Sequence, residues 1–248
     1  MNAFDSCKLY RFDTGRQIFE TVIYQNGYVH WLSLPSIDIS GRSLNGNDRD
    51  IYRSLRSVFP KLKFTSAEQV HSNKVSNANS QSEFEKKKKC DGLVTADFDK
   101  ALIIRTADCI PVFIFNQQQV GLLHAGHKGI QANILEKWNL YSLDQPSYLV
   151  VGDHIKSCCF KVHRDVEMKF SNLPYANNDS IVKINDSQWC VSLVKILYNQ
   201  WHRLERTPEH FFDFSNCTCC NKNLYSYRRS GESLKERTGH VIFRTRVD

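Results

Sequence analysis

Residues 101–124 read ALIIRTADCIPVFIFNQQQVGLLH and contain three short apolar runs that polar residues separate. The runs are Ala101–Arg105, Pro111–Phe115 and Val120–Leu123. Short apolar runs bounded by polar residues are typical of buried strands. We therefore predict three buried β-strands that follow one another closely along the chain.

The sequence before these runs predicts further local structure. Tyr10–Trp31 alternates apolar and polar residues around an Asn26-Gly27 turn, which predicts a hairpin or a pair of strands. The polar stretch Ser76–Lys89 predicts a solvated loop. A short amphipathic helix is predicted after Asn47-Asp48, with its apolar positions at Ile51, Leu55 and Val58.

The sequence after the runs predicts two helices and two strands. The helices are Gly129–Leu140 and Ser192–Arg206, the second of which is clearly amphipathic. The strands are Tyr148–Val151 and His240–Thr245. Because we find neither an internal repeat nor a Pro/Gly/Ser-rich linker, we predict one α+β domain over residues 1–248.

The composition indicates a soluble, folded protein. Of the 248 residues, 41% are hydrophobic, which is enough for a sizeable core. The N-terminus shows no apolar signal-peptide segment, and the longest apolar stretch, Ile110–Phe115, is far shorter than the roughly 20 residues of a membrane helix. We therefore expect a cytoplasmic protein without a membrane partner, whose nine cysteines are mainly reduced thiols.

The net charge of +7 allows anionic partners such as nucleic acids or phosphate esters. The densest basic run, Lys86–Lys89, lies in a polar stretch without interleaved aromatic residues. We therefore expect a generally basic surface and no nucleic-acid partner.

Three residues of metal-ligand type lie at or near the ends of predicted strands: His71, Cys109 and His124. A thiolate and two imidazoles suit zinc, and three protein ligands leave a fourth position open for catalysis. The spacing is not that of a zinc finger. The alternative is that Cys109 is a buried core thiol and that both histidines have ordinary structural roles.

The remaining cysteines predict packing more than metal binding. Cys217 and Cys220 form one C-x-x-C pair that also encloses Cys219, but no second pair stands at the spacing of a zinc ribbon. Cys158-Cys159 has apolar neighbours, which favours a core position.

Two segments contain basic residues that could bind an anion. Gly121–Lys128 resembles a phosphate-binding P-loop, but we reject this motif because His127 stands where it requires lysine. His127 either lines the site of His124 or lies on the surface. Arg228 and Arg229 follow aromatic residues and either clamp a phosphate or are solvated charges on an edge strand.

Five segments together resemble the YfiH family, also called the laccase-domain or polyphenol-oxidase family, whose members include proteins described as purine nucleoside phosphorylases. The resemblance extends from about residue 60 to the C-terminus, in matching order and approximate spacing. The five segments are Glu68-Gln69-Val70-His71, Cys90-Asp91-Gly92-Leu93-Val94-Thr95, Thr106-Ala107-Asp108-Cys109-Ile110-Pro111-Val112, His124-Ala125-Gly126 and Ser226-Tyr227-Arg228-Arg229.

The resemblance implies an α+β domain of mixed β-sheets flanked by helices, with zinc bound by His71, Cys109 and His124. It implies phosphorolysis of adenosine, inosine, guanosine and methylthioadenosine, together with adenosine deamination, so that the partners are a nucleoside and phosphate. We expect a monomer. Further roles are expected for residues near the metal: His127, Lys128, Arg228 and Arg229 on substrate or phosphate, and Asp91 or Asp108 holding a ligand histidine.

The sequence departs from the family pattern at the substrate wall. His127-Lys128 replaces Trp-Arg of the usual motif, and the early Arg and Gly-Gly motif has no clear match in Val22–Pro35. Two alternatives therefore remain. One is a copper-dependent polyphenol oxidase, because a His₂Cys set also binds copper, although the chain lacks any H-x-H pair. The other is a non-catalytic member that binds nucleotide or a partner.

Overall fold

The computed structural model describes residues 9–13, 18–24, 27–38, 55–57, 59–79, 87–139, 148–204, 211–234 and 236–246, and every structural statement below concerns these residues. The helix predicted after Asn47-Asp48 lies mostly outside them, and residues 55–57 are helical.

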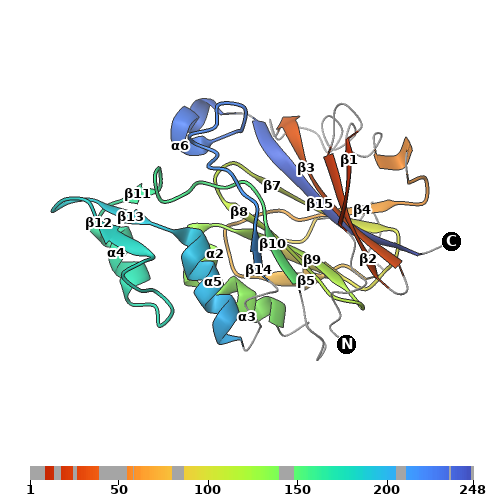
Figure 1. Cartoon of the computed structure of the whole chain (residues 1–248), viewed down its shortest axis with the longest axis horizontal. Coiled ribbons are helices and arrows are strands. Elements are labelled where there is room, and N and C mark those ends of the chain that lie inside the picture. Colours follow the sequence, from red (N-terminus) through yellow and green to blue (C-terminus); the bar gives the residue numbers. More distant parts are fainter. Residues whose placement is uncertain are drawn as a thin grey trace.

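The first β-sheet joins the two ends of the chain. Its order is β1-β2-β3-β15-β7-β4, in which all neighbours are antiparallel except the parallel pair β4 and β7. The C-terminal strand β15 lies between β3 and β7, so it ties the N-terminal strands to the centre of the fold (Figure 1). The strands are β1 (Leu9–Asp13), β2 (Ile18–Tyr24), β3 (Gly27–Asp38), β4 (Lys63–Ser66), β7 (Lys100–Thr106) and β15 (Glu236–Arg246).

The second sheet contains most of the strands that lead to the site. Its order is β14-β10-β8-β9-β6-β5, with parallel pairs at both edges and antiparallel pairs in the middle. Its strands are β5 (Val75–Asn77), β6 (Gly92–Thr95), β8 (Ile110–Phe115), β9 (Val120–Ala125), β10 (Tyr148–Val151) and β14 (Phe211–Asp213).

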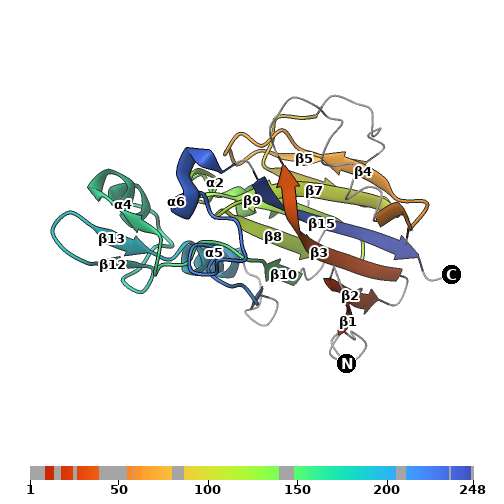
Figure 2. The same ribbon diagram turned by 90° about the horizontal axis from the view of Figure 1, so that it is seen from above.

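A small third sheet and the helices complete the fold. Sheet β11-β13-β12 lies with α4 at one end of the molecule, opposite the C-terminus (Figures 1 and 2). The elements are β11 (Lys161–Val162), β12 (Ile181–Lys183), β13 (Trp189–Val191), α2 (His127–Gln131), α3 (Ile134–Asn139), α4 (Arg164–Ser171), α5 (Leu193–Arg203), α6 (Tyr227–Ser230) and the 3₁₀ turn η3 (Gly231–Ser233).

The core has two main layers because the second sheet is apolar on both faces, as the continuous burial of β8 and β9 shows. One layer fills the space between the two large sheets, with Trp31, Phe113 and Ile242 among its members. The other layer packs the opposite face of the second sheet against α2, α3 and α5, with Trp138 and Trp201 fully buried. Such double-sided burial holds the strand ends rigidly where the site forms.

The predicted α+β fold with mixed sheets is confirmed, and the three central runs are β7, β8 and β9. The predicted strands around Asn26-Gly27, at Tyr148–Val151 and at His240–Thr245 are present. The helix predicted at Ser192–Arg206 is α5. Among the described helices, none combines the length and apolar character that crossing a membrane requires.

Two local predictions are wrong. The single helix predicted for Gly129–Leu140 is broken into α2 and α3, because Asn133 adopts the left-handed backbone conformation (φ 56°) between them. The loop predicted from Ser76 begins later, because Ser76 and Asn77 belong to β5, whose main chain pairs with β6. Such an edge pairing uses backbone groups, so polar side chains do not prevent it.

Candidate metal centre

The ligand atoms of His71, Cys109 and His124 all lie within 4.8 Å of one another. His71 lies in the segment after β4, Cys109 in the turn between β7 and β8, and His124 within β9. His124 is buried, Cys109 is half-buried and His71 is exposed, so the cluster has a closed side and an open side. The structure thus brings together the three residues that the sequence singled out.

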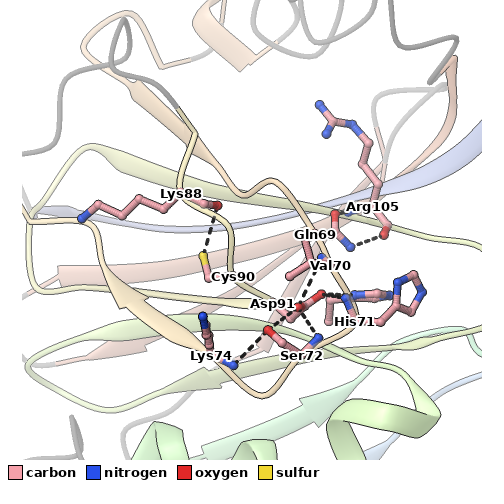
Figure 3. Close-up of polar contacts among 10 residues, drawn as sticks. Gln69, Val70, His71, Ser72, Lys74, Lys88, Cys90, Asp91 and Arg105 are labelled. Atoms are coloured by element: carbon pink, nitrogen blue, oxygen red, sulfur yellow. Dashed lines mark hydrogen bonds and ion pairs between the residues drawn. The ribbon is translucent and has the colours of Figure 1, made fainter.

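The buried carboxylate of Asp91 organises the closed side. Its Oδ1 accepts hydrogen bonds from Nδ1 of His124 (2.8 Å) and from the main-chain N–H of His71 (3.0 Å). Its Oδ2 accepts from the main chain and hydroxyl of Ser72 at 2.5 and 2.8 Å, and from the Val70 N–H at 3.3 Å. Figure 3 shows the carboxylate pointing at this turn of main chain. One side chain therefore orients two candidate ligands, as carboxylates beside metal-bound histidines commonly do.

The hydrogen bond to Asp91 fixes the tautomer of His124. With Nδ1 donating to the carboxylate, Nε2 is the nitrogen that is left for a metal. Burial alone would raise the pKa of Asp91, but the hydrogen bonds from His124 and Ser72 lower it to about 2. Asp91 is therefore ionised at neutral pH.

Cys109 and His124 influence each other strongly. Burial acts to raise the pKa of Cys109, but the charges and hydrogen bonds of His124 and His71 lower it to about 6. Burial acts to lower the pKa of His124, but the Cys109 thiolate and Asp91 raise it. A thiolate at neutral pH follows from this pairing, and the thiolate is the form of cysteine that binds a metal.

Gly126 provides the space for the cluster. A Cβ atom built on Gly126 would lie 2.9 Å from the Cys109 sulfur and 3.3 Å from Cδ2 of His71, both too close for an ordinary contact. His71 and Asp108 also adopt positive φ angles of 58° and 92°, which non-glycine residues rarely do. Zinc fits this site, because the cluster offers one soft thiolate and two imidazoles and because Gly126 has no side chain to occupy the space beside them.

Gln69 fastens the His71 segment to the first sheet. Its Nε2 donates to the main-chain carbonyl of Arg105 (2.7 Å), and its Oε1 accepts from the Arg105 N–H (2.8 Å). Figure 3 shows this pair of bonds beside the Asp91 network. The sequence alone indicates no role for Gln69, because a side chain that bonds to both main-chain groups of another residue has no characteristic local pattern.

Asp108 connects the site to the C-terminal part of the chain. Its Oδ1 accepts a hydrogen bond from Thr218 Oγ1 (2.6 Å), and its Oδ2 accepts from the main-chain N–H of Arg228 (2.6 Å). Of the two aspartates expected beside a ligand histidine, Asp91 therefore lies there, whereas Asp108 contacts Thr218 and Arg228.

The two arginines expected at the phosphate bind main-chain carbonyls. Arg228 Nη1 donates to the carbonyls of Cys159 and Lys161 at 3.0 and 2.9 Å. The guanidinium of Arg229 donates to four carbonyls of one loop: Thr218 at 2.8 Å, Cys219 at 3.1 Å, Asn221 at 3.2 Å, and Leu224. Both arginines lie within α6, a short helix, so the alternative that placed them on an edge strand is wrong. Their binding of phosphate stays a prediction.

Two further basic residues, His127 and Arg237, interact electrostatically with the cluster, and Lys128 follows His127 in the chain. His127 is half-buried at the start of α2; burial lowers its pKa, and the charges of Lys128 and His71 lower it further. Lys128 is exposed. Arg237, at the start of β15, is half-buried: burial lowers its pKa, while the charges of Cys109 and Asp108 raise it. The local sequence does not indicate Arg237, because its neighbours give no sign that β15 brings it within electrostatic range of Cys109.

The family model described as "Multi-copper polyphenol oxidoreductase laccase" matches residues 42–244. The chain belongs to this family. The resemblance to YfiH proteins is thereby confirmed, and the matched segment includes every residue of the cluster.

Curated relatives and solved structures agree with this membership. A purine nucleoside phosphorylase of Borreliella burgdorferi is 29% identical over 58% of this chain and 65% of its own length. A second, of Clostridium acetobutylicum, is 27% identical over 79% of this chain and 83% of its own. The crystal structure of YlmD from Geobacillus stearothermophilus superposes with a TM-score of 0.76 at 19% identity, covering 96% of this chain and all of that one. Because this identity is low, the superposition shows the fold alone.

Proposed function

We propose that the chain is a zinc-dependent purine nucleoside phosphorylase that acts on adenosine, inosine, guanosine and methylthioadenosine and also deaminates adenosine. The observation that carries the proposal is the cluster of His71, Cys109 and His124, closed on one side and open at the exposed His71. The names of the curated relatives support phosphorolysis as the main activity.

Zinc at this site would supply Lewis acidity to a coordinated oxygen of phosphate or water. Asp91 holds His124 and the His71 main chain, so that the ligands need little rearrangement on binding. Cys109 as a thiolate offsets part of the charge of the cation. These residues would therefore hold the metal in a fixed position beside the substrate.

The basic residues near the cluster are suited to the anionic reactant. In phosphorolysis a phosphate oxygen attacks C1′ of the sugar, the glycosidic bond breaks, and the purine leaves with the bonding electrons and takes up a proton. We infer that Lys128 and Arg237 neutralise phosphate charge and that His127 donates a hydrogen bond at the same place. Arg228 and Arg229 remain candidates for binding phosphate. Their hydrogen bonds to main-chain carbonyls give them a structural role as well.

The first experiment is incubation of the purified protein with adenosine and phosphate, followed by chromatography. We expect adenine from phosphorolysis and inosine or hypoxanthine from deamination. Cys109→Ala removes one ligand and should abolish both activities, whereas Cys190→Ser, which changes a half-buried thiol in β13, should leave both intact. Turnover of the Cys109→Ala protein at the wild-type rate would contradict the proposal.

A second candidate is a copper-dependent polyphenol oxidase. It is favoured by the family's description and by the His₂Cys ligand set, which copper also accepts. Within the described residues, however, the only other cluster with metal-ligand geometry contains cysteines alone, so histidine pairs for a multicopper centre are not found there. Metal analysis and the colour of the purified protein separate the two: a blue, copper-loaded protein that oxidises phenols would favour the oxidase.

A further inference from the structure

Two cysteine-containing turns, far apart in the sequence, meet outside the site described above. One turn follows β10 and carries Cys158 and Cys159; the other follows β14 and carries Cys217 and Cys220. The four sulfur atoms all lie within 4.8 Å of one another. Cys158 and Cys220 are exposed and the other two are half-buried. The prediction that Cys158-Cys159 is a core pair is therefore wrong for Cys158.

Four of the six sulfur separations are 3.3–3.8 Å, close to the edges of a metal-centred tetrahedron. Cys158 Sγ lies 3.8 Å from Cys159, 3.7 Å from Cys217 and 3.6 Å from Cys220, and Cys159 Sγ lies 3.3 Å from Cys220. A tetrahedral ion with four sulfurs at about 2.3 Å has S···S edges of about 3.8 Å. A disulfide requires about 2.05 Å, and simple packing of apolar thiols would bury them.

We propose that Cys158, Cys159, Cys217 and Cys220 bind a second zinc ion in a closed Cys₄ site. Zinc is the metal that prefers a tetrahedral shell of four thiolates in a structural role. With all four positions taken by protein, this ion has no place for substrate, unlike the open cluster at His71. The inference does not rest on the proposed function.

The main chain holds both turns in place. The Lys156 N–H donates to Cys217 Sγ (3.4 Å), and an isolated β-bridge joins His154 to Cys217, with the Thr218 N–H on the His154 carbonyl (3.0 Å). The parallel pairing of β10 with β14 brings the two turns to the same edge of the sheet. Main-chain hydrogen bonds therefore join the two turns that carry the four thiols, in addition to the contacts among the sulfur atoms themselves.

Two arginine side chains donate hydrogen bonds to main-chain carbonyls of these same turns. Arg228 donates to the Cys159 carbonyl, and Arg229 donates to the carbonyls of Thr218 and Cys219. A zinc ion with four thiolates carries a net charge of −2, which nearby guanidinium groups stabilise. This arrangement gives the paired arginines a clear role beside the second ion.

The second ion would also stabilise the surroundings of the first site. Thr218 lies between Cys217 and Cys219, and its hydroxyl binds Asp108, which directly precedes Cys109. Fixing the Cys217–Cys220 turn therefore fixes the partner of Asp108. The ion has a positioning role and takes no part in the chemistry.

Zinc content and X-ray absorption of purified full-length variants test the proposal. His71→Ala/Cys109→Ala protein, loaded with zinc sulfate under reducing conditions, should retain one zinc per chain with four sulfurs at about 2.3 Å. Cys158→Ser/Cys220→Ser protein should hold one zinc fewer than Cys190→Ser protein, the matched thiol control.

Three results would overturn the Cys₄ site. They are a zinc-free His71→Ala/Cys109→Ala protein, a nitrogen-containing shell in that protein, and equal zinc content in Cys158→Ser/Cys220→Ser and Cys190→Ser. If the double serine variant does not fold, the spectrum of the His71→Ala/Cys109→Ala protein decides alone. If zinc-loaded wild-type protein shows no phosphorolysis while the His71→Ala/Cys109→Ala protein gives the Cys₄ spectrum, the proposed function is refuted and this site stands.

Discussion

Nδ1 of His124 lies 2.8 Å from Oδ1 of Asp91, and the same oxygen accepts the main-chain N–H of His71. One buried carboxylate thus sets the ring of one ligand and the backbone of another. The link crosses two elements, because Asp91 immediately precedes β6 and His124 lies on the neighbouring strand β9. The arrangement of the closed side of the cluster therefore depends on Asp91.

Asp91→Asn should weaken zinc binding at the His71 cluster by about 10- to 100-fold, as loss of such outer partners does elsewhere. The amide keeps the shape but loses the negative charge that holds His124 and the turn at Ser72. Competition with a chromophoric chelator measures the affinity. Asp186→Asn, at an exposed aspartate that forms an ion pair with Lys183, is the control and should bind zinc normally. Unchanged affinity in Asp91→Asn would refute this role.

Gly126→Ala should destabilise the protein by about 1–3 kcal/mol, the usual cost of overpacking. The added methyl group would lie 2.9 Å from the Cys109 sulfur. In a Cys109→Ala background the same substitution should cost less, because its main obstacle has been removed. Denaturant unfolding of the four proteins gives this coupling directly. Additive losses would show that the clash with Cys109 is not the cause.

Acid should destabilise the protein partly through His240. Burial lowers the pKa of His240 to about 3, while both ring nitrogens contact hydroxyls, Ser33 and Thr106 at 2.8 Å each. Below the ordinary histidine pKa of about 6.5 the unfolded chain takes up a proton that the folded chain does not, so stability is present above that pH and falls as the pH drops towards 3.

The expected loss of stability is about 1.6 kcal/mol between pH 6.5 and 5, because His240 of the unfolded chain is half-protonated at pH 6.5 and almost fully protonated at pH 5. His240→Gln should lose this component of the pH dependence, which urea unfolding at several pH values would show. His202→Gln, at an exposed histidine, should retain it. Parallel stability profiles for wild type and His240→Gln would contradict the prediction.

Arg229→Lys should lower the free energy of unfolding by about 1–2 kcal/mol, because a lysine cannot reach four carbonyls at once. Lys128→Ala should instead raise KM for phosphate, if Lys128 neutralises phosphate charge as proposed. Its effect on stability should be small, because Lys128 is exposed.

Thermal melts and phosphate titrations of both variants separate the two roles. A raised phosphate KM with an unchanged melt in Arg229→Lys would assign that arginine to phosphate.

The sequence predicts the site best where residues that can bind a metal stand at the end of a strand-like apolar run. The runs that became β7, β8 and β9 have short apolar patterns with polar ends, so both the strands and the placement of Cys109 and His124 could be predicted. His71 was identified by its residue type and motif, although its left-handed backbone conformation has no local signal.

Long-range contacts account for what was missed. The convergence of Cys158 with Cys220 depends on the parallel pairing of β10 with β14, which no local pattern encodes. The charge of Cys109 acts on Arg237 because β15, which carries Arg237, lies beside β7 in the first sheet. The break between α2 and α3 comes from the left-handed backbone conformation of Asn133. The spacing of apolar residues gives no sign of this break, because it continues unchanged from α2 into α3.

The central claim is that one zinc ion at His71, Cys109 and His124 enables phosphorolysis. Its most direct test is adenine release from adenosine and phosphate by metal-free protein during titration with zinc. The rate should rise as zinc is added to wild-type and Cys190→Ser protein and stay at the protein-free background in Cys109→Ala. Full adenine release without zinc, or by Cys109→Ala at the wild-type rate, would contradict the account.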